Sequence, residues 1–406
     1  MIRKILTVLS GSVIAQLITL GVTPFLTRIY TPQQYGELAS FLVVVNILGP
    51  IAALAYPLAI SLARTKKIAR SVLTLCYVMT STICSILFLG YLASWAFLDL
   101  PFFIALSTPI AVFCVSIHNS SVLWLNRNEM FGFVTKLTIF QSLLAAFFKL
   151  TFGYIFGTGE ALIYSYLISY LSLALLFFFC ANYFCNETRK FNMNEIDKIA
   201  REYKNFPIYR APQIFLNAVF KNTPILILGA VSSSSVVGFY SLSNSVLILP
   251  LVIMGKSISS VFYPMLARKY NEDDKPYDFL IKVTKVIFFI SICVFTLLSI
   301  LSEMLFTLIF GPEWTQSGEI TRYLCIWFVF YLTSKPIIDA IPIYGLQKFH
   351  LKFEIVTGLL GVSILYFLLM IIENEMYAIF WYSIAMAIFC LLLIYSVTSK
   401  IRKSLK

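Results

Sequence analysis

The sequence predicts an all-α membrane protein with twelve transmembrane helices, and three observations lead to that prediction. The chain of 406 residues is 59% hydrophobic and only 12% charged, whereas soluble domains carry about 25% charged residues. Its mean hydropathy is +0.86. Apolar segments long enough to cross a bilayer, about 20 residues each, recur along the whole chain. This composition excludes a soluble enzyme, a disordered chain and a nucleic-acid-binding domain with its own basic surface.

Twelve apolar segments are predicted to span the membrane. Period-2 alternation is absent, which excludes a β-barrel. The first segment has a basic start, but it is too long for a signal peptide and is expected to remain as an uncleaved span. The seventh is the least apolar, and it is retained because losing it would invert the orientation of everything that follows. The predicted spans are 5–29, 37–63, 71–97, 101–126, 136–156, 161–185, 207–230, 236–265, 279–310, 317–345, 349–372 and 376–399.

The distribution of lysine and arginine predicts the orientation. If the N-terminus is cytoplasmic, 25 of the 31 basic residues fall in cytoplasmic segments, as the positive-inside rule requires. We therefore expect both termini in the cytoplasm. The net charge of +12 is largely this topological signal, so no nucleic-acid partner is predicted.

A weak internal repeat predicts two lobes of six helices. Thr23–Leu26 reads TPFL and Thr223–Leu226 reads TPIL, and three further matches follow in the same order at offsets between 200 and 204. Six spans are an even number, so the two halves enter the membrane in the same direction. We expect an N-terminal lobe at 1–190, a cytoplasmic linker at 191–206 and a C-terminal lobe at 207–406, arranged around a central cationic cavity.

Prolines match between the halves as well. Pro24 and Pro224 fall in spans one and seven, and Pro50 and Pro250 fall in spans two and eight. A proline inside a helix removes a backbone hydrogen bond and kinks the helix. These residues can shape bent helices that pack well, serve as hinges of a moving lobe, or do both.

Six basic residues remain inside the predicted membrane region, and they are the first candidates for ligand binding. Lys221, Lys256 and Lys335 are the deepest, and a lysine at such depth is costly if it faces lipid. Lysine ammonium groups bind phosphate well, so an anionic ligand such as a diphosphate is the natural candidate. The alternative is pairing with acids of other spans. Three further residues, closer to the outer boundary, either join the substrate site or snorkel to the interface: Arg28, Lys149 and Arg322.

Acidic residues are few in the spans. Asp339 lies four residues after Lys335 and can pair with it on one helix face. Glu319 lies three residues before Arg322 and can pair with it in the same way. Asp339 is the deepest carboxylate and the candidate for ion coupling. The alternative is a permanent Lys335–Asp339 ion pair that holds a kinked span.

Uncharged amides complete the predicted cavity lining, because amides hydrogen-bond sugar hydroxyls. Amides between membrane helices also act in packing, and that alternative stays open. The candidates are Gln16, Gln213 and Asn217.

The sequence contains no motif of a nucleotide-hydrolysing or metal-dependent enzyme. It lacks GxxxxGK[ST], GxSxG, HExxH and any Cys/His cluster. The eight cysteines lie in or beside apolar runs without a CxxC pair and are interpreted as small hydrophobic residues. We therefore predict a transporter without cofactor or metal. An ion gradient would drive transport, or the substrate would move downhill without coupling to an ion.

The segment Ser10–Phe41 resembles the opening of the Wzx-type polysaccharide flippases, a branch of the multidrug/oligosaccharidyl-lipid/polysaccharide exporter superfamily. The shared pattern is P-x-L-x-R-x-x-x-P-x-x-[FY]-G, which is carried here by Pro24, Leu26, Arg28, Pro32, Tyr35 and Gly36. The resemblance implies a flippase that moves undecaprenyl-diphosphate-linked oligosaccharide units, for O-antigen or a related surface polysaccharide, by alternating access. It also implies membrane lipids and other polysaccharide-assembly proteins as partners.

Two other functions compete with this one. A drug/cation antiporter of the same superfamily would need carboxylates in its cavity, and the first span has none. A membrane-bound transferase of polysaccharide assembly would need a catalytic acid, base or metal constellation, which the sequence does not display.

Overall fold

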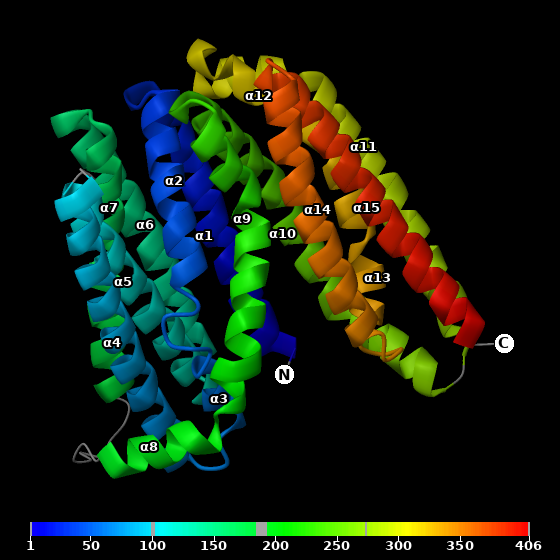
Figure 1. Ribbon diagram of the computed structural model, residues 1–406. Helices are drawn as coiled ribbons and strands as arrows, with labels where there is room; N and C mark the ends of the chain where they lie inside the picture. Colours follow the sequence, from blue (N-terminus) through cyan, green and yellow to red (C-terminus); the bar gives the residue numbers. More distant parts are fainter. Residues whose placement is uncertain (1, 99–101, 184–192, 273, 405–406) are drawn as a thin grey trace. The chain divides into compact units, whose positions relative to one another are not determined.

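A computed structural model describes the backbone of residues 2–98, 102–183, 193–272 and 274–404, and the side chains of 11–93, 106–181, 196–255, 261–272 and 274–403. Every regular element in these ranges is a helix (Figure 1), which confirms the predicted all-α class. The elements are α1 Ile2–Ile29, α2 Pro32–Leu48, α3 Pro57–Leu62, α4 Lys66–Leu98, α5 Phe102–Arg127, α6 Phe131–Phe156, α7 Gly159–Tyr183, α8 Met193–Glu202, a π-helical turn Phe206–Arg210, α9 Ala211–Val231, α10 Ser234–Asn271, α11 Pro276–Phe310, a 3-10 turn Pro312–Trp314, α12 Thr315–Thr333, α13 Lys335–Ala340, α14 Gln347–Ile371 and α15 Glu375–Ser404.

Ten helical segments of the described chain are long and apolar enough to cross a membrane. Each coincides with one of the predicted spans. They are Gly11–Ile29, Lys66–Ala93, Leu106–Arg127, Phe131–Phe156, Gly159–Ala181, Phe206–Val231, Ser234–Gly255, Pro276–Phe310, Gln347–Ile371 and Glu375–Lys403.

The second predicted span, 37–63, is divided rather than kinked. Helix α2 ends at Leu48, Pro50 lies in the turn that follows, and α3 begins at Pro57. The expectation that Pro50 sits inside a helix is therefore wrong. Proline cannot donate the next helical hydrogen bond, and it disfavours helical geometry in the residue before it. The chain turns through Leu54 and Ala55, whose φ angles are 49° and 59°.

The tenth predicted span, 317–345, is divided as well. Helix α12 ends at Thr333 and the short α13 begins at Lys335, with Pro336 as its second residue. The same property of proline accounts for this break. Pro24, Pro224 and Pro250 do lie inside continuous helices, as predicted. The count of twelve crossings remains a prediction, with ten continuous helices and two divided segments.

The chain forms two compact units, and both are discontinuous in sequence. The first consists of Met1–Val22 and Glu37–Leu226, and the second of Thr23–Gly36 and Ile227–Lys406. The lobes predicted from the repeat, 1–190 and 207–406, are each continuous in sequence. Their boundaries as functional lobes remain a prediction.

The first unit packs α3, α4, α5, α6, α7 and α8 around one apolar cluster. Ile196 and Ile199 of α8 are buried in this cluster. The Tyr56 hydroxyl donates to the Ala200 carbonyl oxygen at 3.3 Å. The divided span and the amphipathic helix α8 therefore stabilise each other.

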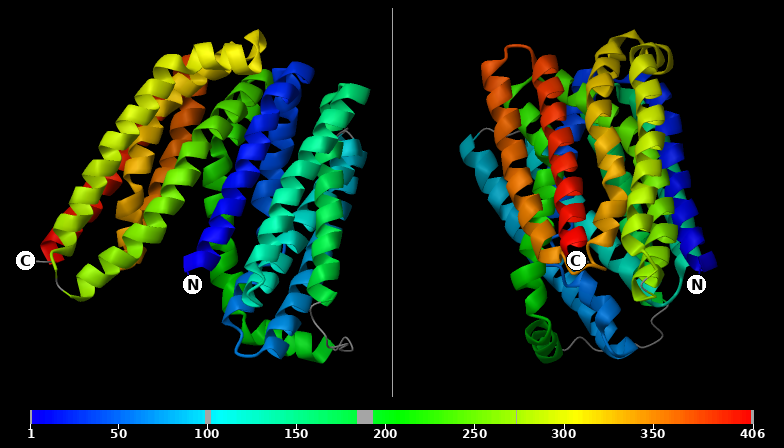
Figure 2. Two further views of the ribbon diagram at one scale, coloured as in Figure 1. Left: turned by 180° about the vertical axis from the view of Figure 1, so that it is seen from behind. Right: turned by 90° about the vertical axis from the view of Figure 1, so that its right-hand side faces the viewer.

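In the second unit, α14, α15, α12 and α11 lie side by side in that order (Figure 2). Ile401 near the end of α15 and Leu280 near the beginning of α11 belong to one apolar cluster with Ile337 of α13. The α11–α12 turn consequently lies at the opposite end of this unit from the end of α15.

The short segment Thr23–Gly36 meets α10 at two glycines, Gly36 and Gly238, which are 202 residues apart. A Cβ atom on Gly36 would lie 1.7 Å from the Ser234 carbonyl oxygen, and one on Gly238 would lie 2.0 Å from the Pro32 carbonyl oxygen. Residues 32 and 36 thus contact residues 238 and 234 reciprocally, with one common offset of 202. Reciprocal contact between equivalent positions is what a two-fold relation produces, and the repeat of two six-helix lobes remains a prediction.

Candidate functional site

Helix α9 carries a polar stripe made of three predicted site residues. Gln213, Asn217 and Lys221 are spaced by four residues, so they share one face of the helix over about 12 Å. Asn217 and Lys221 are exposed and Gln213 is half-buried. Gln213 is held by Arg210, whose Nη1 donates to its Oε1 at 2.9 Å. The stripe belongs to the first unit and combines a cation with amide groups.

Two other predicted residues of the first unit lie on different helices. Gln16 on α1 and Lys149 on α6 are both half-buried. Asn222 is a polar residue of α9 outside the stripe. Its side-chain amide donates to the Ala218 carbonyl oxygen at 2.8 Å, which is a hydrogen bond within the same helix.

Lys335 lies at the break between α12 and α13 in the second unit. It is the first residue of α13 and is half-buried, and its Nζ stands 4.8 Å from the ring centroid of Tyr331. Such a cation–π contact partly compensates an ammonium group for lost water. Asp339 lies one turn further along α13 and is half-buried too.

The three deep lysines divide between the two units. Lys221 belongs to the first unit and Lys335 to the second, and the side chain of Lys256 on α10 lies outside the described residues. A cavity shared by all three remains a prediction.

Arg322 has a partner that the sequence did not suggest. Its Nη2 lies 2.7 Å from Glu303 Oε1, which joins α12 to α11. Glu319, the acid three residues before it, accepts a hydrogen bond from the Tyr323 hydroxyl at 2.8 Å instead. The suggested Glu319–Arg322 pairing was wrong, because the close approach of α11 and α12 brings a carboxylate from another helix.

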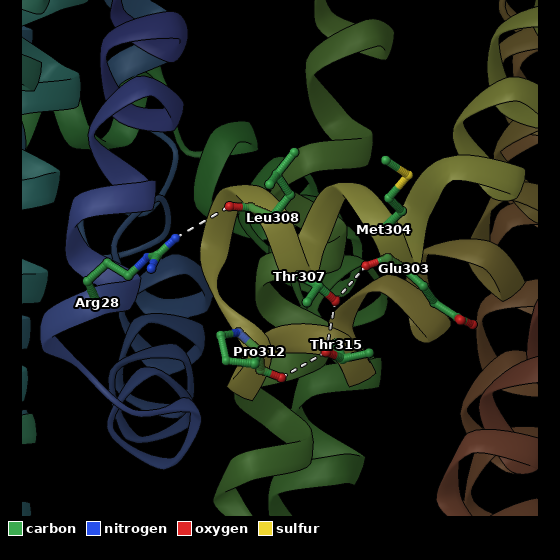
Figure 3. A pocket seen from close by; sticks show the side chains of 7 residues that line it. All are labelled: Arg28, Glu303, Met304, Thr307, Leu308, Pro312 and Thr315. Atoms are coloured by element: carbon green, nitrogen blue, oxygen red, sulfur yellow. Dashed lines mark hydrogen bonds between the residues drawn. The ribbon is translucent and has the colours of Figure 1, made fainter.

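Arg28 contributes to a pocket of about 650 Å³ at the α11–α12 turn of the second unit. The pocket is lined by Arg28, Glu303, Met304, Thr307, Leu308, Pro312 and Thr315. Figure 3 shows Arg28 reaching from α1 toward the Leu308 carbonyl oxygen, to which its Nη2 donates at 3.4 Å. Gly311, with φ of 109°, brings the backbone of the turn against this guanidinium.

Trp314 fixes the backbone beside Arg28, and the sequence analysis did not single it out. It is fully buried, and its Nε1 donates to the Thr27 carbonyl oxygen at 3.1 Å. Its ring also meets Tyr35 edge-on, with centroids 5.1 Å apart. A tryptophan after a Gly-Pro turn between two apolar runs is the only local signal that could have indicated this role.

Comparison with known proteins identifies the family. The family of polysaccharide biosynthesis proteins matches residues 25–319. The chain belongs to this family. Two relatives of this polysaccharide biosynthesis protein are an uncharacterized membrane protein in the cps region of Klebsiella pneumoniae and the amylovoran biosynthesis protein AmsL of Erwinia amylovora. The first is 24% identical over 84% of this chain and 71% of the relative. The second is 24% identical over 28% and 30%.

Solved structures of transporters share the fold of this polysaccharide biosynthesis protein. An inward-facing multidrug resistance transporter of the MATE family superposes with a TM-score of 0.72 at 13% identity, covering 97% of this chain and 95% of its own. The lipid II flippase MurJ in an inward closed conformation gives 0.71 at 14% identity, covering 95% and 86%. The chain therefore has the MATE/MurJ fold.

Proposed function

We propose that this chain is a flippase for undecaprenyl-diphosphate-linked oligosaccharide repeat units in the bacterial inner membrane, with both termini in the cytoplasm. Family membership across residues 25–319 supports a role in polysaccharide biosynthesis. The observation that carries the proposal is the stripe of Gln213, Asn217 and Lys221 on a helix of transmembrane length, in which Asn217 and Lys221 are exposed. An exposed lysine at that depth avoids a large cost only where water or a ligand meets it.

The stripe has the chemistry that this substrate requires. An ammonium group pairs with a diphosphate, and amides hydrogen-bond sugar hydroxyls. Substrate would reach the stripe in a cleft that opens to one side of the membrane at a time, while the lipid tail stays in the bilayer. Lys256 and Lys335 would add positive charge to this path, and Gln16, Lys149, Arg28 and Arg322 would border it.

Replacing Lys221 by alanine in the native host tests the proposal. Surface polysaccharide should fall about tenfold, because a charge-assisted hydrogen bond contributes roughly 1.5–3 kcal/mol, and lipid-linked repeat units should accumulate at the cytoplasmic face. The matched control is Lys198→Ala on α8, where another exposed lysine is replaced. Normal surface polysaccharide at normal protein level in Lys221→Ala would overturn the ligand role.

A drug/cation antiporter is the second candidate, since a MATE transporter shares the fold. Deleting the gene separates the two functions. A flippase mutant loses surface polysaccharide and accumulates lipid-linked units, whereas an antiporter mutant keeps its polysaccharide and becomes sensitive to cationic drugs.

A further inference from the structure

The pocket at the α11–α12 turn combines a cation with an apolar wall. Arg28 is exposed, and none of the carboxylates in the described part of the chain lies within ion-pair distance of it. Its one hydrogen bond is the long contact to Leu308. A guanidinium has five N–H donors, so most of those on Arg28 have no partner among the described residues.

The one carboxylate that lines the pocket does not neutralise Arg28. Glu303 is paired with Arg322 at 2.7 Å, and Figure 3 shows its carboxylate pointing away from Arg28. Thr315, in the first turn of α12, lines the same pocket. The positive end of the α12 dipole therefore adds to the guanidinium charge on this side. Both features favour an anion.

The apolar wall continues out of the pocket along α11. Leu308 and Met304 are 68% and 66% exposed, and Ile300 and Leu297 continue the same face at 70% and 61%. The steps of three and four residues keep these side chains on one stripe. From Leu308 to Leu297 the stripe runs for about 16 Å along the helix, which is the scale of an acyl chain in one leaflet.

We infer that this notch between the end of α1 and α11 binds one membrane phospholipid, with the phosphate on Arg28 and an acyl chain along the α11 stripe. Arginine holds phosphate by paired N–H···O contacts. The position of Arg28 in the last turn of α1 suits the depth of a headgroup. Trp314 acts as a positioning residue, because its bond to the Thr27 carbonyl oxygen fixes the backbone next to Arg28. This inference does not rest on the proposed transport activity.

Native mass spectrometry of the delipidated full chain tests the site. Dioleoyl-phosphatidylglycerol is titrated against the wild type, Arg28→Gln, Arg28→Lys and the matched control Arg402→Gln, an exposed arginine on α15. Arg28→Gln should weaken the tightest binding event about tenfold. Arg28→Lys should stay within about threefold of the wild type, and Arg402→Gln should leave binding unchanged.

Two comparison ligands separate the possible sources of the phosphate. A dioleoyl glycolipid with a glucose headgroup and no phosphate should bind weakly and equally to the wild type and Arg28→Gln. Inorganic phosphate alone should not compete at millimolar concentration. Equal phosphatidylglycerol binding by the wild type and Arg28→Gln would overturn the site, and so would equal weakening by Arg402→Gln. Arg28-dependent competition by inorganic phosphate would replace the lipid by a free anion.

A second variant keeps the test decisive if Arg28→Gln aggregates. Thr315 is exposed, and a glutamate in the first turn of a helix is well tolerated. Thr315→Glu should weaken phosphatidylglycerol binding by charge repulsion while the protein elutes normally. Unchanged binding in this variant would count against the site independently of Arg28.

Discussion

Trp314 donates its indole N–H to the Thr27 carbonyl oxygen in a fully buried environment. Trp314→Phe keeps an aromatic ring and removes this donor, so a buried carbonyl loses its partner. We expect a loss of roughly 1–3 kcal/mol in the free energy of unfolding, measured as a lower Tm in detergent. Trp381→Phe is the control, since Trp381 is 51% exposed. Equal Tm values for the two variants would show that the bond to Thr27 contributes nothing.

Gly36 is a second position where one atom decides stability. The Cβ of Gly36→Ala would meet the Ser234 carbonyl oxygen at 1.7 Å, so α2 and α10 must separate. We expect a loss of about 1–3 kcal/mol or more, visible as a lower Tm and a lower yield of folded protein. Gly21→Ala on α1 is the control, because no atom lies within 4 Å of its added Cβ. Its Tm should be equal to or above that of the wild type.

At the scale of elements, Arg127 ties the end of α5 to the end of the short helix α3. Its guanidinium donates to the Ser61 carbonyl oxygen at 3.0 Å and to that of Ala63. Arg127→Gln removes these contacts from a segment that lacks a continuous helix to support it. The free energy of unfolding should fall by roughly 1–3 kcal/mol, measured as a lower Tm in detergent. Lys67→Gln removes the same charge from an exposed side chain nearby, and its Tm should match the wild type.

The elements themselves were largely predictable, and the breaks were not. Ten predicted spans are helices because an apolar run of bilayer length has no other way to satisfy its backbone in lipid. Pro50 ends a helix, whereas Pro250 lies inside one. Both prolines lose the same hydrogen bond. The difference depends on what the surrounding chain packs against, and a local pattern does not contain that information.

The candidate site was predictable in its residue types and less so in its pairings. The stripe on α9 follows from a four-residue spacing that can be read in the sequence. The Arg322–Glu303 pair and the bond between Trp314 and Thr27 join different helices. Only the three-dimensional packing of those helices identifies such partners.

For the molecule as a whole, replacing Asp339 tests whether transport is coupled to an ion gradient. This prediction rests on the proposed transport activity. We expect Asp339→Asn to lower export roughly tenfold without moving its pH profile. Asp339 shares a face of α13 with Lys335, and losing a carboxylate near a half-buried ammonium leaves that charge less compensated. Export is measured as surface polysaccharide across a range of external pH. A shifted or flattened profile would instead identify Asp339 as the coupling site. Asp278→Asn, at an exposed position on α11, is the control.

The membership of Thr23–Gly36 in the second unit has a consequence for biosynthesis. The ribosome releases this segment early, but the tryptophan that bonds to Thr27 follows 287 residues later. The second unit therefore cannot complete its packing until Trp314 has been synthesised. Residues 23–36 remain without this partner while most of the first unit is synthesised and inserted into the membrane. A chain truncated before Trp314 leaves that segment without its anchor. Two halves expressed separately and divided between α8 and α9 would each lack a part that its own unit requires, so they would have to assemble together to be stable.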